Sequence, residues 1–269
     1  MDAHSFFDFE TPLAIAHRGG LAHWPENTLH AFEQAVALGM PALEMDIHRT
    51  KDGVLVVHHD PTAERCSGAT GAIADMTLSE FKALDGGYNW TNNDGASYPF
   101  RGLGHGFPTL IEMFAAFPDT RMTIDNKPLN PEMALQFART ILDQGMEHRV
   151  IVASFHAANL RAVRIAHPEI VTACAEQEVL RFIIAQRLGL SRLFPPHCEV
   201  LSVPYRSHGI QVCTRQFIRA AHKRGVQVHV WTVNDADIMR QLLGWGVDGI
   251  LTDYPERLLE VMGAQDNKN

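Results

Sequence analysis

The 269-residue sequence contains little cysteine and no long apolar run. Its four cysteines, Cys66, Cys174, Cys198 and Cys213, form no CxxC pair, and a chain of this length buries enough surface to need no covalent cross-link. We expect buried or incidental free thiols. No apolar run approaches the roughly 18 residues of a membrane span, and the first residues include acids where a signal peptide is basic. The sequence therefore predicts a soluble, cytoplasmic protein with no stable membrane anchor.

Basic residues are also scarce, since 23 Lys and Arg stand against 31 Asp and Glu, a formal net charge of −8. This balance disfavours nucleic acid, or an anionic membrane held by overall charge, as a partner. Any phosphate site must therefore be local, and we expect a small-molecule substrate. With 46% hydrophobic and 20% charged residues the chain is globular, and its oligomeric state is left open.

Short apolar runs that favour strands alternate with helical stretches along the chain. This alternation is typical of a parallel sheet wrapped by helices, and eight such units predict a (β/α)8 TIM barrel. Because one such barrel takes about 250 residues, we expect residues 1–269 to form a single domain. The predicted strands are 13–17, 42–47, 122–127, 150–155, 170–175, 199–204, 226–233 and 247–252.

A ninth apolar run, 54–59, follows the second strand after only a short turn at 51–53. A parallel crossover needs about a dozen residues, so this run must return as a hairpin. We therefore place 48–108 as an insertion, or lid, between the second strand and the second helix. Within it, Thr77 and Glu80 have the spacing of a capping box that begins a small helix.

Acidic side chains gather at the ends of two neighbouring barrel strands. Because side chains alternate across a strand, Glu44 and Asp46 share the inward face, and Asp125 and Lys127 do the same on the next strand. Three buried acids favour a bound cation, and their oxygen ligands suit Mg²⁺ or Ca²⁺. The alternative is a closed salt-bridge network of the acids with Lys127 and Arg18.

Two histidines lie where this mouth should be. His17 ends the first strand and His59 ends the returning arm of the hairpin, whereas His58 must point the opposite way and serves as an internal control. Together with a metal and the cations Arg18 and Lys127, they predict hydrolysis of an anionic oxygen ester, of which a phosphodiester is the natural candidate. Which histidine is the acid and which the base stays open.

Ordered motifs over nearly the whole chain resemble the glycerophosphodiester phosphodiesterase family. They are AHRGG at 16–20, PENT at 25–28, LEMDIH at 43–48, VVHHDPT at 56–62, VHVWTVN at 228–234 and DGILTDYP at 248–255. The resemblance implies a TIM barrel with a small insertion after the second strand. It also implies metal-dependent hydrolysis of glycerophosphodiesters to glycerol 3-phosphate and an alcohol, usually with Mg²⁺ or Ca²⁺.

The resemblance carries roles onto individual residues. Where the family has Glu-x-Lys on the third barrel strand, this chain has Asp125-Asn126-Lys127, so the third ligand is one methylene shorter and reaches a metal directly or through water. Trp231 either forms an apolar wall for the glycerol or fills the barrel interior. The remaining roles implied are acid/base catalysis for His17 and His59, a phosphate contact for Arg18, and metal ligation for Glu44 and Asp46.

Other functions stay open at this stage. A lysophospholipase D would lay an acyl chain along the insertion, whose aromatic residues could equally hold the insertion to the barrel. A non-catalytic phosphometabolite-binding protein would have lost an acid/base residue, and neither His17 nor His59 is missing. A zinc amidohydrolase would need an HxH motif, but arginine follows His17. The aromatic residues of the insertion are Tyr88, Trp90, Tyr98, Phe100 and Phe107.

Overall fold

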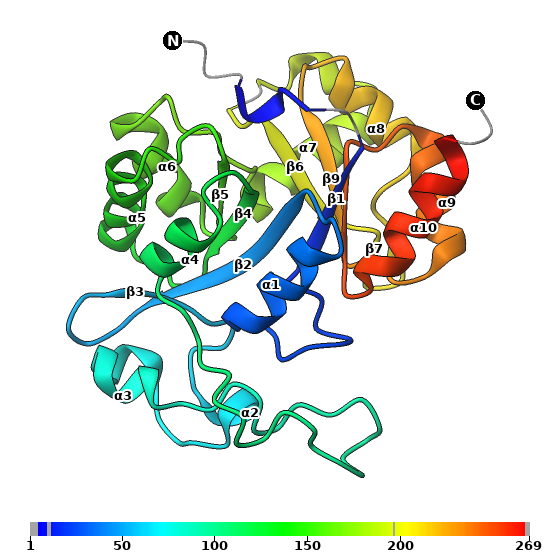
Figure 1. Ribbon diagram of the computed structural model, residues 1–269. Helices are drawn as coiled ribbons and strands as arrows, with labels where there is room; N and C mark the ends of the chain where they lie inside the picture. The colour runs from blue at the N-terminus through cyan, green and yellow to red at the C-terminus, as the bar shows by residue number, and fades with distance from the viewer. Residues whose placement is uncertain (1–4, 10–11, 196, 267–269) are drawn as a thin grey trace.

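The computed structural model describes residues 5–9, 12–195 and 197–266. Its centre is a curled, mainly parallel sheet with helices packed around the outside (Figure 1). The strand order is β5-β4-β2-β1-β10-β9-β6, so the first strand lies between the second and the last. These strands are β1 (Leu13–His17), β2 (Ala42–Arg49), β4 (Arg121–Asn126), β5 (Val150–Ala153), β6 (Val200–Pro204), β9 (Gln227–Trp231) and β10 (Gly249–Thr252).

One predicted barrel strand, 170–175, is reduced to single bridges. Thr172 pairs in parallel with Val152 of β5, and Ala173 pairs with Val200 of β6, so the segment joins the two edges of the sheet. It does not extend further because Glu178 accepts a hydrogen bond from the backbone N–H of Ala175 and the chain turns into a helix. The predicted α/β fold with a curled parallel sheet is confirmed, and seven of the eight predicted segments form strands, four of them shorter than predicted.

The helices begin and end where local chemistry requires. Thr28 caps α1 with its side chain, and Gly246, at φ 81°, ends α9 in the left-handed region that glycine tolerates. Their apolar faces pack on the outer side of the sheet, against residues such as Met45 and Ile124. The helices around the sheet are α1 (Leu29–Ala37), α4 (Leu110–Ala116), α5 (Pro131–Asp143), α6 (Ala157–Ala166), α7 (Glu176–Arg187), α8 (Arg215–His222), α9 (Ala236–Trp245) and α10 (Pro255–Asp266).

The insertion begins with the predicted hairpin. β3 (Leu55–Val57) runs antiparallel to the end of β2, with Val57 opposite Ile47. The segment then forms α2 (Glu64–Ser67), a 3₁₀ turn η2 (Ile73–Asp75) and α3 (Leu78–Lys82), and Thr77 and Glu80 form the predicted capping box. Its elements lie apart from the helices that surround the sheet (Figure 1). It has an apolar cluster of its own, made by Val56, Ala63, Cys66, Ile73, Phe81, Leu84 and Phe107.

The prediction that all four cysteines are unpaired thiols was wrong for two of them. Cys174 and Cys198 form a disulfide with their Cα atoms 5.2 Å apart, whereas Cys66 and Cys213 are free and buried as expected. The pair forms because the N–H of Cys174 donates to the carbonyl of Val200, 2.8 Å away, so two segments distant in sequence lie side by side. Spacing alone does not reveal this contact. No helix in the described residues is long and apolar enough to cross a membrane.

Candidate functional site

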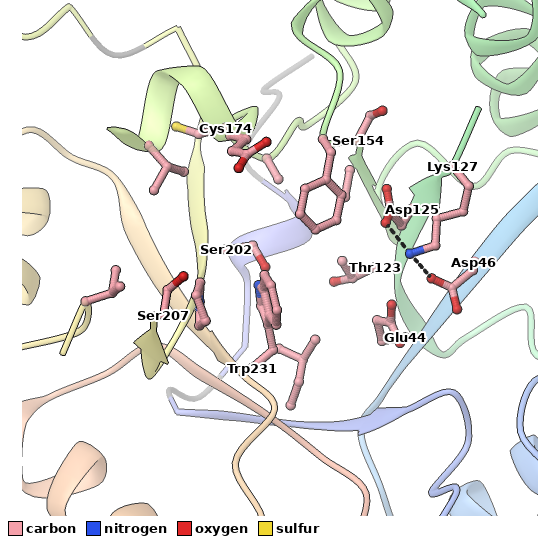
Figure 2. A pocket seen from close by; sticks show the side chains of 18 of the residues that line it. Glu44, Asp46, Thr123, Asp125, Lys127, Ser154, Cys174, Ser202, Ser207 and Trp231 are labelled. Atoms are coloured by element: carbon pink, nitrogen blue, oxygen red, sulfur yellow. Dashed lines mark hydrogen bonds and ion pairs between the residues drawn. The ribbon is translucent and has the colours of Figure 1, made fainter. Parts of the chain in front are cut away.

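A cavity of about 600 Å³ opens at the carboxyl ends of the parallel strands. It is where barrel-type α/β proteins place their chemistry, because the loops after the strands converge there. Glu44, Asp46, Asp125 and Lys127 lie on one side of it, and Trp231 and Cys174 lie on the other (Figure 2). All eight residues that the sequence predicted for the site line it: His17, Arg18, Glu44, Asp46, His59, Asp125, Lys127 and Trp231.

Acids of β2 and β4 face one another with the ammonium group of a lysine between them. Asp46 and Asp125 are direct neighbours in the parallel register, and the Lys127 Nζ lies 2.9 Å from a carboxylate oxygen of each (Figure 2). Burial alone would raise the pKa of Asp46, but Lys127 and Arg18 outweigh it and lower that pKa. The salt-bridge network that was the alternative to a metal site is therefore present around Asp46.

Glu44 is not neutralised in the same way. Among the described residues its carboxylate receives only the backbone N–H of Arg18, at 3.1 Å, and lies 3.9 Å from the His17 Nε2. Burial and the nearby Asp46 raise the pKa of Glu44 to about 7. Burial also raises the pKa of Asp125, whose Oδ1 is buried with no hydrogen-bond partner. Negative charge thus exceeds what Lys127 and Arg18 balance.

This donor set fits a hard divalent cation. Carboxylate oxygens are the ligands that Mg²⁺ and Ca²⁺ prefer, and the unpaired Asp125 oxygen and the poorly compensated Glu44 are what a cation would satisfy. The three carboxylates are not gathered into one tight cluster, because Lys127 lies between two of them. Among the described residues, one set of three or more His, Cys, Asp or Glu side chains has all its potential ligand atoms within 4.8 Å of one another. It is Cys174, Glu178 and Cys198, two of which form the disulfide.

His17 is oriented by a carboxylate from the far end of the chain. Its Nδ1 lies 2.6 Å from Asp253 Oδ1, and Asn234 donates to the other oxygen of Asp253 at 2.7 Å. Because this contact occupies Nδ1, the other ring nitrogen of His17, Nε2, faces Glu44. Burial would lower the pKa of His17, but Glu44 and the hydrogen bond to Asp253 outweigh it and raise the pKa. The sequence analysis did not select Asp253, and it missed this contact.

His59 has the same kind of partner but the opposite electrostatic surroundings. Its Nδ1 lies 2.6 Å from Asp60 Oδ1, while Asp60 also accepts a hydrogen bond from Arg65. Burial lowers the pKa of His59, and Lys127 and Arg18 add to that effect, so that together they outweigh the raising effects of Asp46 and Asp60. The pKa values of the two site histidines are thus shifted in opposite directions.

His58 behaves as the internal control predicts. It is fully buried on the other face and packs at a ring distance of 4.8 Å from Phe107, inside the insertion. It does not line the cavity. The alternation of side chains along the returning arm therefore correctly predicted which of the two adjacent histidines faces the cavity.

Arg18 links the two histidine networks. At φ 51° it occupies the left-handed region, and its guanidinium lies 3.3 Å from Asp46 and 3.0 Å from Glu26. Glu26 also accepts hydrogen bonds from both terminal nitrogens of Arg65, and Arg65 in turn forms an ion pair with Asp60. A guanidinium fixed in this way is a preorganised contact for an anion.

Asn27 belongs to the site rather than to the helix start. Thr28 is the N-cap of α1, whereas the side-chain amide of Asn27 donates to Asp46 at 3.0 Å. The amide thereby fixes the rotamer of a buried carboxylate. Its φ of 58° places it in the turn that leads from β1 to α1.

Apart from Trp231, the apolar side of the cavity comes from residues that the sequence analysis did not select. Trp231 lies 6.1 Å from the ring of Phe155, and α7 adds Val179, Leu180 and Ile183. The five insertion aromatics considered for an acyl chain do not line the described cavity, which favours the alternative that they have a packing role. They hold the insertion together instead: Trp90 packs on Phe100, Tyr88 and Tyr98 stack on Arg101, and Phe107 is buried.

A cavity with two histidines beside buried acids and fixed cations defines a hydrolase of anionic esters. Comparison with known proteins gives the same class. Residues 17–257 match the sequence profile of the glycerophosphoryl diester phosphodiesterase family, and the chain belongs to this family. It is therefore an enzyme of the glycerophosphodiester phosphodiesterase class, and dependence on a divalent metal is typical of that family.

Individual relatives agree over nearly the full length. A glycerophosphodiester phosphodiesterase of Caldanaerobacter subterraneus is 32% identical over 93% of this chain and 97% of its own. A lysophospholipase D of Rattus norvegicus is 26% identical over 92% of this chain and 85% of its own. The crystal structure of a glycerophosphodiester phosphodiesterase from Thermotoga maritima superposes with a TM-score of 0.70 at 25% identity, covering 94% of this chain and 99% of that one.

Proposed function

We propose that the protein hydrolyses glycerophosphodiesters to glycerol 3-phosphate and an alcohol by metal-dependent catalysis with two histidines. The observation that carries this proposal is the pair His17 and His59. Each has its Nδ1 on a carboxylate, both line one acid-walled cavity, and their pKa values are shifted apart. Two titratable groups whose surroundings separate their pKa values mark an acid and a base. We also infer that the bridges at 172 and 173 close the sheet into the predicted barrel.

The acid/base roles follow from the charges around each ring. His59, kept neutral by burial, Lys127 and Arg18, would accept the proton of the attacking hydroxyl, from water or from the glycerol of the substrate. His17, kept protonated beside Glu44 and Asp253, would give a proton to the departing alkoxide. Asp253 and Asp60 fix the ring orientations, because each leaves only Nε2 free to face the substrate.

The remaining polar groups would hold the phosphate. Glu44, Asp46 and Asp125 would bind Mg²⁺ or Ca²⁺, which when bound supplies Lewis-acid polarisation of a phosphoryl oxygen. Arg18 is fixed by Glu26 and Asp46 and would oppose the negative charge on the phosphoryl oxygens. Lys127, which follows β4 and bridges Asp46 and Asp125, would do the same.

The pH dependence of glycerol 3-phosphate release from glycerophosphocholine tests this assignment. We expect kcat to rise with pH as His59 loses its proton, at a pKa below 6.5, and to fall as His17 loses its proton, at a pKa above 6.5. In Asp253→Asn the loss of the carboxylate lowers the pKa of His17, so the alkaline limb should move to lower pH while the acid limb stays. Movement of the acid limb instead would reverse the roles of the two histidines.

A second candidate, lysophospholipase D activity, is supported by the apolar wall of Phe155, Trp231 and α7. An acyl chain that binds against this wall would be removed from water without burying any charged group. We expect lysophosphatidylcholine to be cleaved, and Leu180→Asn with Ile183→Asn to lower the ratio of kcat/KM for lysophosphatidylcholine over glycerophosphocholine by about 10-fold. Leu129→Asn, an exposed leucine outside the cavity, is the matched control. Cleavage of the deacylated substrate alone would remove this candidate.

A further inference from the structure

The outward side of α7 and of the segment after it is apolar without being covered. Five exposed leucine and isoleucine side chains lie within 180–193, whereas the other exposed large apolar side chains are spread along the rest of the described chain. Three of the five recur every fourth residue and so form one stripe on the helix. We call this surface the α7 face: Leu180, Ile184, Leu188, Leu190 and Leu193, with exposed fractions of 56%, 51%, 67%, 48% and 76%.

The α7 face is basic within an acidic protein. After the acids of its first turn, α7 and the segment that follows it, residues 179–198, carry three arginines and no acid, whereas the whole chain has a net charge of −8. Arg181, Arg187 and Arg192 are exposed among the apolar residues of this face, and none of them forms an ion pair within the described chain. α8, which packs beside α7, adds the exposed Arg215 and Arg219. Apolar side chains interleaved with unpaired arginines are typical of helices that lie in a lipid interface.

The α7 face is continuous with the catalytic cavity. Leu180 is exposed on the outside and also lines the cavity, and its neighbours Val179 and Ile183 line it too. The disulfide of Cys174 to Cys198 connects the residues just before α7 to those just before β6. A lipid that leaves a bilayer at this face would therefore enter the cavity past the apolar side chains of Val179, Leu180 and Ile183.

We propose that the α7 face docks the protein on bilayer surfaces that contain anionic phospholipids. The charge complementarity favours a bilayer over a second copy of the chain, because a two-fold dimer through this face would set the arginines of one copy against those of the other. The overall charge of −8 does not oppose docking, since charges more than about 8 to 10 Å from the surface are screened at physiological salt. Docking goes beyond the proposed reaction, and it is measured without substrate turnover.

Co-sedimentation with unilamellar vesicles tests the proposal. We expect the protein to bind vesicles of phosphatidylcholine mixed with about one-third phosphatidylglycerol, and to bind pure phosphatidylcholine vesicles much more weakly. Ile184→Ser with Leu188→Ser and Leu193→Ser should weaken binding about 10-fold or more. Arg187→Gln with Arg192→Gln should weaken it about 10-fold and reduce its dependence on salt. Neither variant touches a cavity residue, so both should hydrolyse glycerophosphocholine at the wild-type rate.

Matched controls make the outcome decisive. Ile111→Ser with Leu129→Ser and Ile165→Ser removes three equally exposed apolar side chains elsewhere, and Arg139→Gln with Arg240→Gln removes two exposed arginines elsewhere. Both controls should bind like the wild type. The proposal is overturned if the wild type ignores anionic vesicles, if the controls lose as much binding, or if sedimentation velocity shows a dimer that only the α7-face variants dissociate. If the serine variant unfolds early, the glutamine pair decides.

Discussion

Replacing His59 by alanine is expected to lower kcat for glycerophosphocholine hydrolysis by about 10² to 10⁴-fold, the range of a lost general acid or base. His17→Ala should lose a similar amount. The two losses should differ in one respect, because only His17 is proposed to protonate the leaving alkoxide. With a diester whose leaving group is a nitrophenol, which departs without a proton, His17→Ala should recover most of its rate and His59→Ala should not.

The matched control is the adjacent histidine. His58 is buried against Phe107 and does not line the cavity, so His58→Gln should lower the melting temperature and leave kcat nearly unchanged. Metal binding, measured by calorimetry with the ion alone, should persist in all three variants. Full activity of His59→Ala, or recovery of His59→Ala but not His17→Ala with the nitrophenol substrate, would contradict the assignment.

Removing the buried acids is expected to have an effect of comparable size. Glu44→Gln and Asp46→Asn should each lower kcat by about 10³-fold, because a bound ion supplies several kcal/mol of charge stabilisation to the reacting phosphate. Calorimetric titration with Mg²⁺ or Ca²⁺ should show correspondingly weaker binding. Glu44→Gln should also lower the pKa of His17, since Glu44 raises it.

The control for the buried acids is an exposed carboxylate. Asp52→Asn changes a fully exposed carboxylate in the insertion and should leave both metal affinity and kcat unchanged. Wild-type metal affinity in both acid variants would mean that Glu44, Asp46, Asp125 and Lys127 form only a salt-bridge network. In that case the ion would have to bind elsewhere.

The sequence was sufficient where local periodicity decides the structure. β1 begins and ends where predicted, and the alternation along β2 and β4 correctly placed Glu44, Asp46 and Asp125 on the cavity side. The hairpin of β3 followed from a turn too short for a crossover. These features depend on neighbours in the chain, so a single sequence reveals them.

Features that depend on contacts distant in sequence were missed. Asp253 lies 236 residues from His17, and nothing near either residue indicates their hydrogen bond. Asp60 could have been found, because it follows His59 directly. The disulfide of Cys174 and Cys198 and the reduction of 170–175 to bridges both depend on how β5 and β6 approach one another.

Trp231 was the one residue of the apolar wall that the sequence analysis selected, and the rest of the wall was missed for a similar reason. Aromatic residues are concentrated in the insertion, which drew the acyl-chain hypothesis there, whereas the structure places the wall on α7. The aliphatic residues of α7 resemble ordinary helix positions in sequence. Only their position beside Trp231 and Phe155 reveals that they line the cavity.

The account is tested most directly by adding metal back to stripped protein. Protein freed of divalent ions with a chelator is supplied with glycerophosphocholine and with Mg²⁺, Ca²⁺ or neither, and release of glycerol 3-phosphate is measured. We predict release with at least one of the two ions, loss of release without them, and no restoration by either ion in the His17→Ala, His59→Ala double variant. Undiminished release from the stripped wild type, or none with either ion, would contradict the account.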